Sequence, residues 1–109
     1  MHRTRLLFAV ALIASAARAE PDPKVVRAWK AKCASCHGAG GKGDTEMGRK
    51  AKLPDFSTPA WQAGKTDAQI KASIENGTKK GDNEMDPYKD KLPPEQIDGL
   101  VAYVRGLKS

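Results

Sequence analysis

The chain has 109 residues, a length that fits one small domain. It carries 19 basic and 13 acidic residues, and this formal net charge of +6 raises the question of an anionic partner. Only two Trp, two Tyr and two Phe occur, so a core built from the chain alone would be thin.

Residues 1–19 have the composition of a secretory signal peptide: a positive start, an apolar run of about 12 residues at 6–17, and small residues at a cleavage position. The alternative is a retained membrane anchor, but the run falls short of the roughly 20 apolar residues that span a bilayer. We predict cleavage after Ala19, which leaves one exported domain at residues 20–109, in the periplasm or otherwise outside the cytoplasm.

Removal of the signal changes the charge argument. Arg3, Arg5 and Arg18 would be lost, which leaves 16 basic against 13 acidic residues and a net charge of +3. A charge this small gives little support to nucleic-acid binding.

The predicted first helix begins with Asp22 as N-cap and Pro23 at the first helical position, where a missing N–H costs nothing. Its apolar side chains recur on one face, as in a helix that packs against a core: Val25, Val26, Trp29 and Cys33. The helix therefore carries a thiol at its end.

The segment Cys33-Ala34-Ser35-Cys36-His37 has the spacing of a c-type haem attachment site. Two thiols on neighbouring turns can add to the two vinyl groups of one porphyrin, and the histidine that follows can ligate the iron. No other cysteine occurs, and His37 is the one histidine after the signal. The motif predicts one covalent haem c, which would also supply apolar surface to the thin core.

Three other uses of these cysteines are less well supported. A disulfide would leave His37 unexplained and would close too short a loop to stabilise the fold much. A zinc site normally needs four protein ligands, and this chain offers three. A thioredoxin-like redox pair needs a βαβ setting, for which no strand signal precedes Cys33.

The glycines at 38, 40, 41 and 43 predict a flexible loop rather than a regular element. Residues 53–56 form a short apolar turn, and Ser57 or Thr58 with Pro59 starts a brief helical segment through Trp61 that Gly64 ends.

A capping box at 66–69 starts the next helix, which carries Ile70 and Ile74 inward and ends at Gly77. Residues 78–91 are polar and irregular, and the last helix runs from about Pro94 to Leu107. Gly99 inside this helix suggests a close approach of another helix. With no strand signal, the predicted fold is all-α.

Together, the attachment motif, Trp29 in the first helix, Met85 in a late loop and Leu100–Val104 in the last helix make the chain resemble the class I, small soluble monohaem c-type cytochromes. The resemblance implies three to five short helices wrapped around one covalent haem, with the first and last helices crossing near the attachment site. Many members place proline directly after the axial methionine, whereas Asp86 intervenes here.

His37 is the predicted proximal iron ligand, and Met47 or Met85 can supply a thioether on the other face. Met85 is favoured because its loop is polar and stiffened by Pro87, and because the resemblance places the sixth ligand late. The resemblance also implies that the Pro54 carbonyl accepts from His37 and that Trp61 donates to a haem propionate. A rigid turn at Pro54 and plain packing of Trp61 are the alternatives.

A methionine–histidine pair leaves the iron no open position, so we predict an exported one-electron carrier and not an enzyme. The alternatives are an electron-entry subunit of a larger oxidoreductase complex, and a haem peroxidase or gas sensor, which would need an open iron site. A monomer with transient redox protein partners is expected. Lysines near the attachment and methionine loops would steer acidic partners toward the haem: Lys32, Lys42, Lys65, Lys79, Lys80, Lys89 and Lys91.

Overall fold

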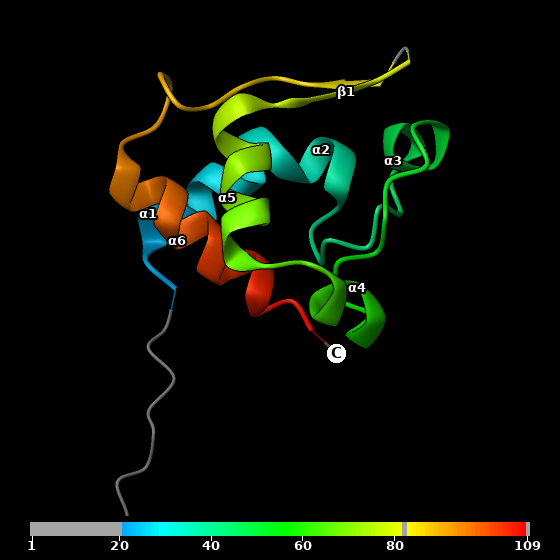
Figure 1. Cartoon of the computed structure of the whole chain (residues 1–109), viewed down its shortest axis with the longest axis horizontal. Helices are drawn as coiled ribbons and strands as arrows, with labels where there is room; N and C mark the ends of the chain where they lie inside the picture. Colours follow the sequence, from blue (N-terminus) through cyan, green and yellow to red (C-terminus); the bar gives the residue numbers. More distant parts are fainter. Residues whose placement is uncertain (1–20, 82, 109) are drawn as a thin grey trace, which may run out of the picture.

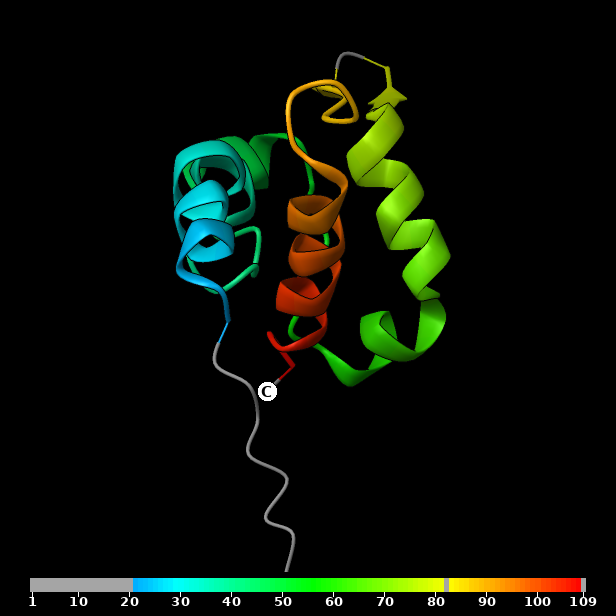
Figure 2. The ribbon, with the colours of Figure 1, turned by 90° about the vertical axis from the view of Figure 1, so that its left-hand side faces the viewer.

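The last helix lies at the centre of the fold, with the first helix packed against one side of it (Figure 2). The computed structural model describes residues 21–81 and 83–108. Helix α1 (Pro23–Ala28) continues through a π-helical turn, η1 (Trp29–Cys33), into α2 (Ala34–His37), and α6 (Pro94–Arg105) packs against α1. Figure 2 shows α6 between the α1–η1 segment and α5 (Asp67–Asn76).

Gly99 of α6 is the point of closest approach between these helices. A Cβ atom at this position would lie 2.5 Å from Cγ2 of Val25, so a side chain would push α1 away. The close approach predicted for Gly99 is confirmed. The core lies around this contact and consists of Val25, Ala28, Trp29, Ile70, Leu92, Ile97, Leu100, Val101 and Val104.

Side-chain caps begin three of the helices as predicted. The Asp22 carboxylate accepts from the Lys24 N–H at 2.8 Å, and the Thr58 hydroxyl accepts from the Trp61 N–H at 3.3 Å at the start of α4 (Pro59–Gly64). Thr66 and Gln69 form the reciprocal capping box of α5, at 3.1 and 2.9 Å. These local signals predict the helix starts because a cap needs only residues two or three positions away.

Helix α3 (Glu46–Lys50) lies in a stretch for which the sequence predicted no regular structure. Thr45 caps it, and its hydroxyl accepts from the Gly48 N–H at 2.9 Å. The helix is one turn long, too short for an apolar periodicity to reveal it.

The prediction that the chain contains no strand is wrong at one place. Strands β1 (Thr78–Lys80) and β2 (Asn83–Met85) pair antiparallel, with Thr78 opposite Met85 and Lys79 opposite Glu84. Both strands are short and mostly exposed, so they lack the alternation of apolar and polar residues that marks a half-buried strand. The fold is otherwise helical, as predicted.

The β1–β2 hairpin extends over the top of the helices toward α3 (Figure 1). The Asn83 side-chain amide donates to the Ala51 carbonyl at 3.1 Å, which ties the hairpin to the end of α3. After the hairpin the chain returns to α5, where the Tyr88 N–H donates to the Ile74 carbonyl at 2.9 Å. The segment between Asn83 and Tyr88, which contains Met85, is thus held at both of its ends.

A polar cluster closes the opposite end of the molecule. Arg105 donates to the Asp67 carboxylate at 2.6 Å, to the Gln62 carbonyl at 2.7 Å and to the Lys65 carbonyl. The Gln62 amide in turn donates to the carbonyls of Phe56 and Val104, at 2.7 and 3.0 Å. The end of α6 is therefore joined to α4 and to the start of α5. Within residues 21–81 and 83–108, no helix is both long and apolar enough to cross a bilayer.

Candidate functional site

The two thiols of the attachment motif lie on consecutive helical turns and are not joined to each other. Cys33 ends η1, Cys36 lies in α2, and both are free and half-buried. Burial raises the pKa of the Cys33 thiol to about 11, an effect that the positive charge of Lys32 partly opposes. Neither sulfur is in a disulfide, so both are available to add to a vinyl group.

The π-helical turn η1 comes directly before the motif. The N–H of Ala34 donates to the carbonyl of Trp29, five residues earlier, which widens the helix at Cys33. Single wide turns of this kind inside α-helices often occur at functional sites. The periodicity of the first helix did not reveal this turn, because its apolar face continues through it.

The His37 imidazole packs among aromatic rings in the interior. Its ring centroid lies 4.8 Å from that of Phe56, in a stacked arrangement, and 6.1 Å from that of Trp29. Burial lowers the His37 pKa, which favours the neutral imidazole that binds a metal. The Nδ1 atom of His37 is buried and makes no hydrogen bond within the described residues.

The two candidate thioether ligands differ in burial. Met47 is 60% exposed on α3, whereas Met85 is half-buried at the end of β2. Three residues after Met85, the Tyr88 hydroxyl donates to the Lys32 carbonyl at 3.4 Å. Burial, together with Cys33, Asp86 and Cys36, raises the Tyr88 pKa, so the segment after Met85 lies against the attachment motif.

The other two predicted residues are Pro54, which lies beside Gly43, and Trp61, which lies beside Phe56. The hydrogen bond predicted from His37 to the Pro54 carbonyl is not made in this structure, where Nδ1 has no partner. The Pro54 carbonyl lies beside Gly43, 3.3 Å from where a Cβ would be, and the Gly43 N–H donates to the His37 carbonyl at 2.8 Å. Trp61 packs against Phe56 with ring centroids 4.3 Å apart.

These residues fit a covalently attached haem. Two free thiols and an imidazole that burial keeps neutral follow one another across the end of η1 and α2, and a buried imidazole nitrogen is left without a partner in the described residues. Aromatic side chains surround the imidazole and provide the apolar setting that a porphyrin needs. Among the described residues, no three His, Cys, Asp or Glu side chains gather as they would around a zinc ion.

Sequence reasoning missed three residues that shape this site. Phe56 stacks on His37, Tyr88 joins the methionine loop to the motif, and Thr45 donates to the Cys36 carbonyl at 2.7 Å. Phe56 and Tyr88 are among the few aromatic residues of the chain, and that scarcity was a usable signal. Thr45 stands three residues before Gly48 with no capping glutamate or glutamine, so its sequence signal is weak.

Residues 22–104 match the family described as cytochrome c oxidase, cbb3-type, subunit III. Among curated proteins, cytochrome c6 of Nostoc sp. (strain PCC 7120) is 36% identical over 72% of this chain and 63% of its own length. The cbb3-type cytochrome c oxidase subunit FixP of Bradyrhizobium diazoefficiens is 32% identical over 69% of this chain. The match spans 23% of FixP, so the chain corresponds to only part of either relative.

Among solved structures, the KustC0563 c-type cytochrome superposes with a TM-score of 0.69 at 34% identity, over 77% of this chain and 96% of the other. A point mutant of KustC0563 gives a TM-score of 0.67 at the same identity, over 77% of this chain and 98% of the mutant. The fold and the covalent haem c follow from these matches. The chain belongs to the family of cytochrome c oxidase, cbb3-type, subunit III, and is a small c-type cytochrome.

Proposed function

We propose that this chain is an exported carrier of single electrons in which Cys33 and Cys36 bind one haem c. His37 is the proximal iron ligand and Met85 the distal one. The observation that carries this proposal is the sequence of two free thiols and one half-buried imidazole on consecutive helical turns, with burial favouring the neutral imidazole. The haem would supply an iron that cycles between Fe(II) and Fe(III) by gaining or losing one electron.

The chain's own residues would close both faces of the haem. His37 would hold the iron on one side, and its imidazole packs on Phe56. Met85 is preferred to Met47 for the other position because it is the more buried of the two, and because Tyr88 brings its loop against the motif. With both positions filled, the iron has no open place for a substrate. This supports a carrier rather than a peroxidase or gas sensor.

Two residues complete the proposed site. A carbonyl acceptor would orient the imidazole through Nδ1, and the Pro54 carbonyl is the candidate because it lies beside Gly43, which already holds the His37 backbone. Trp61 is the candidate donor to a haem propionate, since an indole carries one N–H donor. Its observed packing on Phe56 fits both a propionate donor and a residue that only packs.

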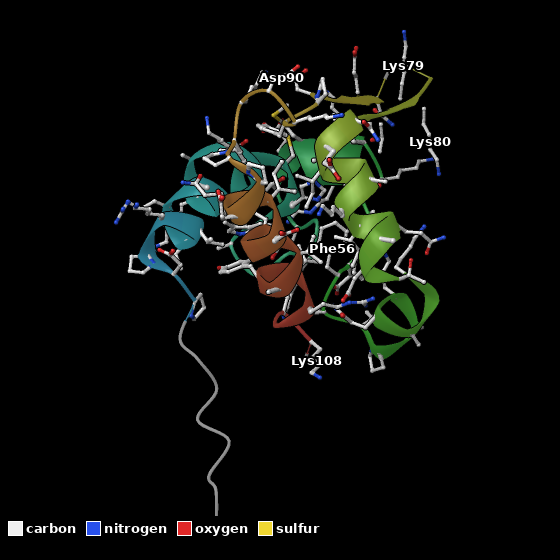
Figure 3. The ribbon with its side chains drawn as sticks, turned by 60° about the vertical axis from the view of Figure 1, so that its left-hand side comes forward. Phe56, Lys79, Lys80, Asp90 and Lys108 are labelled. Carbon is white, nitrogen blue, oxygen red and sulfur yellow. The ribbon has the colours of Figure 1, made fainter. Side chains whose placement is uncertain are left out.

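The partners are proposed to be redox proteins with acidic surfaces, which bind transiently to a monomeric carrier. Lys79 and Lys80 are exposed on β1 and point away from the body of the molecule (Figure 3). Positive charges in such a position raise the rate of encounter with an anionic partner at low salt. Export is inferred from the signal-like residues 1–19, which lie outside the described part of the chain.

The test is an absorption spectrum of the purified protein, oxidised and then reduced, before and after carbon monoxide is added. A low-spin c-type spectrum with a far-red methionine–iron band, and no change with carbon monoxide, is the expected result. Ready binding of carbon monoxide would show an open iron and would overturn the carrier assignment. His37→Ala should abolish the low-spin spectrum.

A second function is favoured by the family match, whose description names an oxidase subunit. In that case the chain would accept electrons as a fixed part of a larger complex rather than as a free shuttle. Size-exclusion chromatography of a native extract separates the two, because a free carrier elutes at its own mass and a subunit elutes with its complex.

A further inference from the structure

Helix α2 is too short to satisfy its own carbonyl groups. It spans only Ala34–His37, and the last four carbonyls of any helix lack partners within it. The Ala34 carbonyl accepts from the Gly38 N–H at 2.9 Å, and the His37 carbonyl accepts from the Gly43 N–H at 2.8 Å. The Cys36 carbonyl, between them, accepts from the Thr45 hydroxyl at 2.7 Å. Thr45 thus supplies the donor for the residue that carries the second thiol.

The Thr45 hydroxyl makes two hydrogen bonds in opposite senses. It donates to Cys36 and accepts from the Gly48 N–H at 2.9 Å, and a hydroxyl has one proton and two lone pairs for this purpose. The other two capping threonines make their bonds elsewhere. Thr58 donates to the carbonyl of Asp55, three residues earlier, and Thr66 lies in the exposed capping box of α5. Thr45 alone among these three caps reaches the attachment motif.

Helix α3 packs directly on the backbone that Thr45 holds. A Cβ at Gly48 would lie 2.5 Å from the Cys36 carbonyl oxygen and 2.6 Å from that of Gly43, so the two segments are in backbone contact. Figure 1 shows α3 beside α2. The carbonyls of both Cys36 and His37 are therefore held by residues between 43 and 48.

We propose that Thr45 is a positioning residue for the iron ligand. By holding the Cys36 carbonyl, its hydroxyl sets the orientation of the last turn of α2 and thus of the His37 imidazole plane. The imidazole makes no side-chain hydrogen bond within the described residues, and its proposed acceptor, the Pro54 carbonyl, lies beside Gly43 in the same backbone contact. Its orientation therefore depends on ring packing and on how this backbone is held. The inference rests on the proposed ligation of iron by His37.

Two substitutions separate the donor from the cap. Thr45→Asp keeps the cap, because aspartate is at least as good an N-cap as threonine, but an ionised carboxylate only accepts and cannot bond the Cys36 carbonyl. Thr45→Ser keeps both hydrogen bonds. Thr66→Asp makes the same chemical change in the cap of α5, where the hydroxyl accepts from the Gln69 N–H within an exposed capping box, and serves as the matched control.

The readout is the proton NMR spectrum of the haem methyl groups in the oxidised holoprotein, whose paramagnetic shifts depend on the orientation of the axial imidazole. Thr45→Asp should change these shifts, while Thr45→Ser and Thr66→Asp should retain the wild-type pattern. In the reduced protein, the Gly43 amide should exchange with solvent roughly fivefold faster in Thr45→Asp, because the turn that carries its acceptor, the His37 carbonyl, loses the neighbouring hydrogen bond at Cys36. Thr45→Val removes the donor and the cap together but adds no charge, and it should shift the methyl resonances in the same direction.

Unchanged haem methyl shifts in both Thr45→Asp and Thr45→Val would overturn the proposal and leave Thr45 as a helix cap only. Equal changes in Thr66→Asp would do the same, since the effect would then be a general one of the added negative charge. A wild-type protein that carries no haem would instead refute the proposed function, and that result is visible in the absorption spectrum before any variant is made.

Discussion

The ring of Phe56 stacks on the imidazole of His37, with 4.8 Å between the ring centroids. Phe56 is itself held in place, because its N–H donates to the Gly41 carbonyl at 2.8 Å and its carbonyl accepts from Gln62. Figure 3 shows its position in the interior, between α6 and α5. Phe56, which packs on the proposed iron ligand, is thus held through both its backbone N–H and its backbone carbonyl.

Phe56→Ala should therefore lower the free energy of unfolding by about 2–4 kcal/mol, below the range for fully buried phenylalanines because Phe56 is half-buried. Urea unfolding of the holoprotein, followed by circular dichroism, measures this loss. Phe56→Leu is the control, which should recover most of the stability because leucine still fills the site. Equal stability of the alanine variant and wild type would show that the stacking contributes nothing.

The contact of α1 with α6 gives a second test. Gly99→Ala should destabilise the protein by roughly 1–3 kcal/mol, since the new Cβ would meet Val25 at 2.5 Å and force the helices apart. Gly64→Ala is the matched control, because no atom lies within 4 Å of its Cβ position. Alanine is a better helix former, so this control should be neutral or more stable by up to about 1 kcal/mol. A stable Gly99→Ala variant would contradict the tight crossing.

The sequence predicted most reliably what is decided by residues close together in the chain. The Thr66–Gln69 capping box and the cysteine spacing can be recognised without knowledge of the fold. The first predicts where α5 begins, and the second predicts the haem attachment site. The hairpin was missed because residues distant in the sequence hold it in place. Asn83 bonds the Ala51 carbonyl, and the Tyr88 N–H bonds the Ile74 carbonyl. The stacking of Phe56 on His37 joins residues 19 positions apart and depends on the same long-range packing.

The assignment of the distal ligand is tested by two methionine substitutions. Met85→Ala should keep the haem attached, remove the far-red band of the oxidised protein, lower the reduction potential and let carbon monoxide bind the reduced iron. Met47→Ala should change none of these, because its side chain is 60% exposed. A reversed pattern would make Met47 the ligand and leave the carrier function in place.

The docking charges are tested with small oxidants of opposite sign. The double variant Lys79→Glu/Lys80→Glu should be oxidised about tenfold more slowly by anionic hexacyanoferrate(III) at low salt, and faster by cationic tris(phenanthroline)cobalt(III). Added salt should remove the difference, since charges are screened beyond ~8 Å at physiological ionic strength.

The control for this experiment makes the same charge change elsewhere. Lys24 lies at the start of α1, and Lys108, near the end of the chain, lies at the opposite end of the molecule from the hairpin in Figure 3. Lys24→Glu/Lys108→Glu should react at nearly the wild-type rate with both oxidants. Equal effects in the two double variants would place the docking face away from the hairpin.

The most direct test of covalent attachment, on which the whole account depends, is the mass of the denatured protein. Because Cys33 and Cys36 lie in one motif and are free to react, the expected mass is that of the chain from Glu20 onward plus one haem. A haem that survives denaturation must be bound through carbon–sulfur bonds. A bare chain with Cys33 joined to Cys36 in a disulfide would contradict the account.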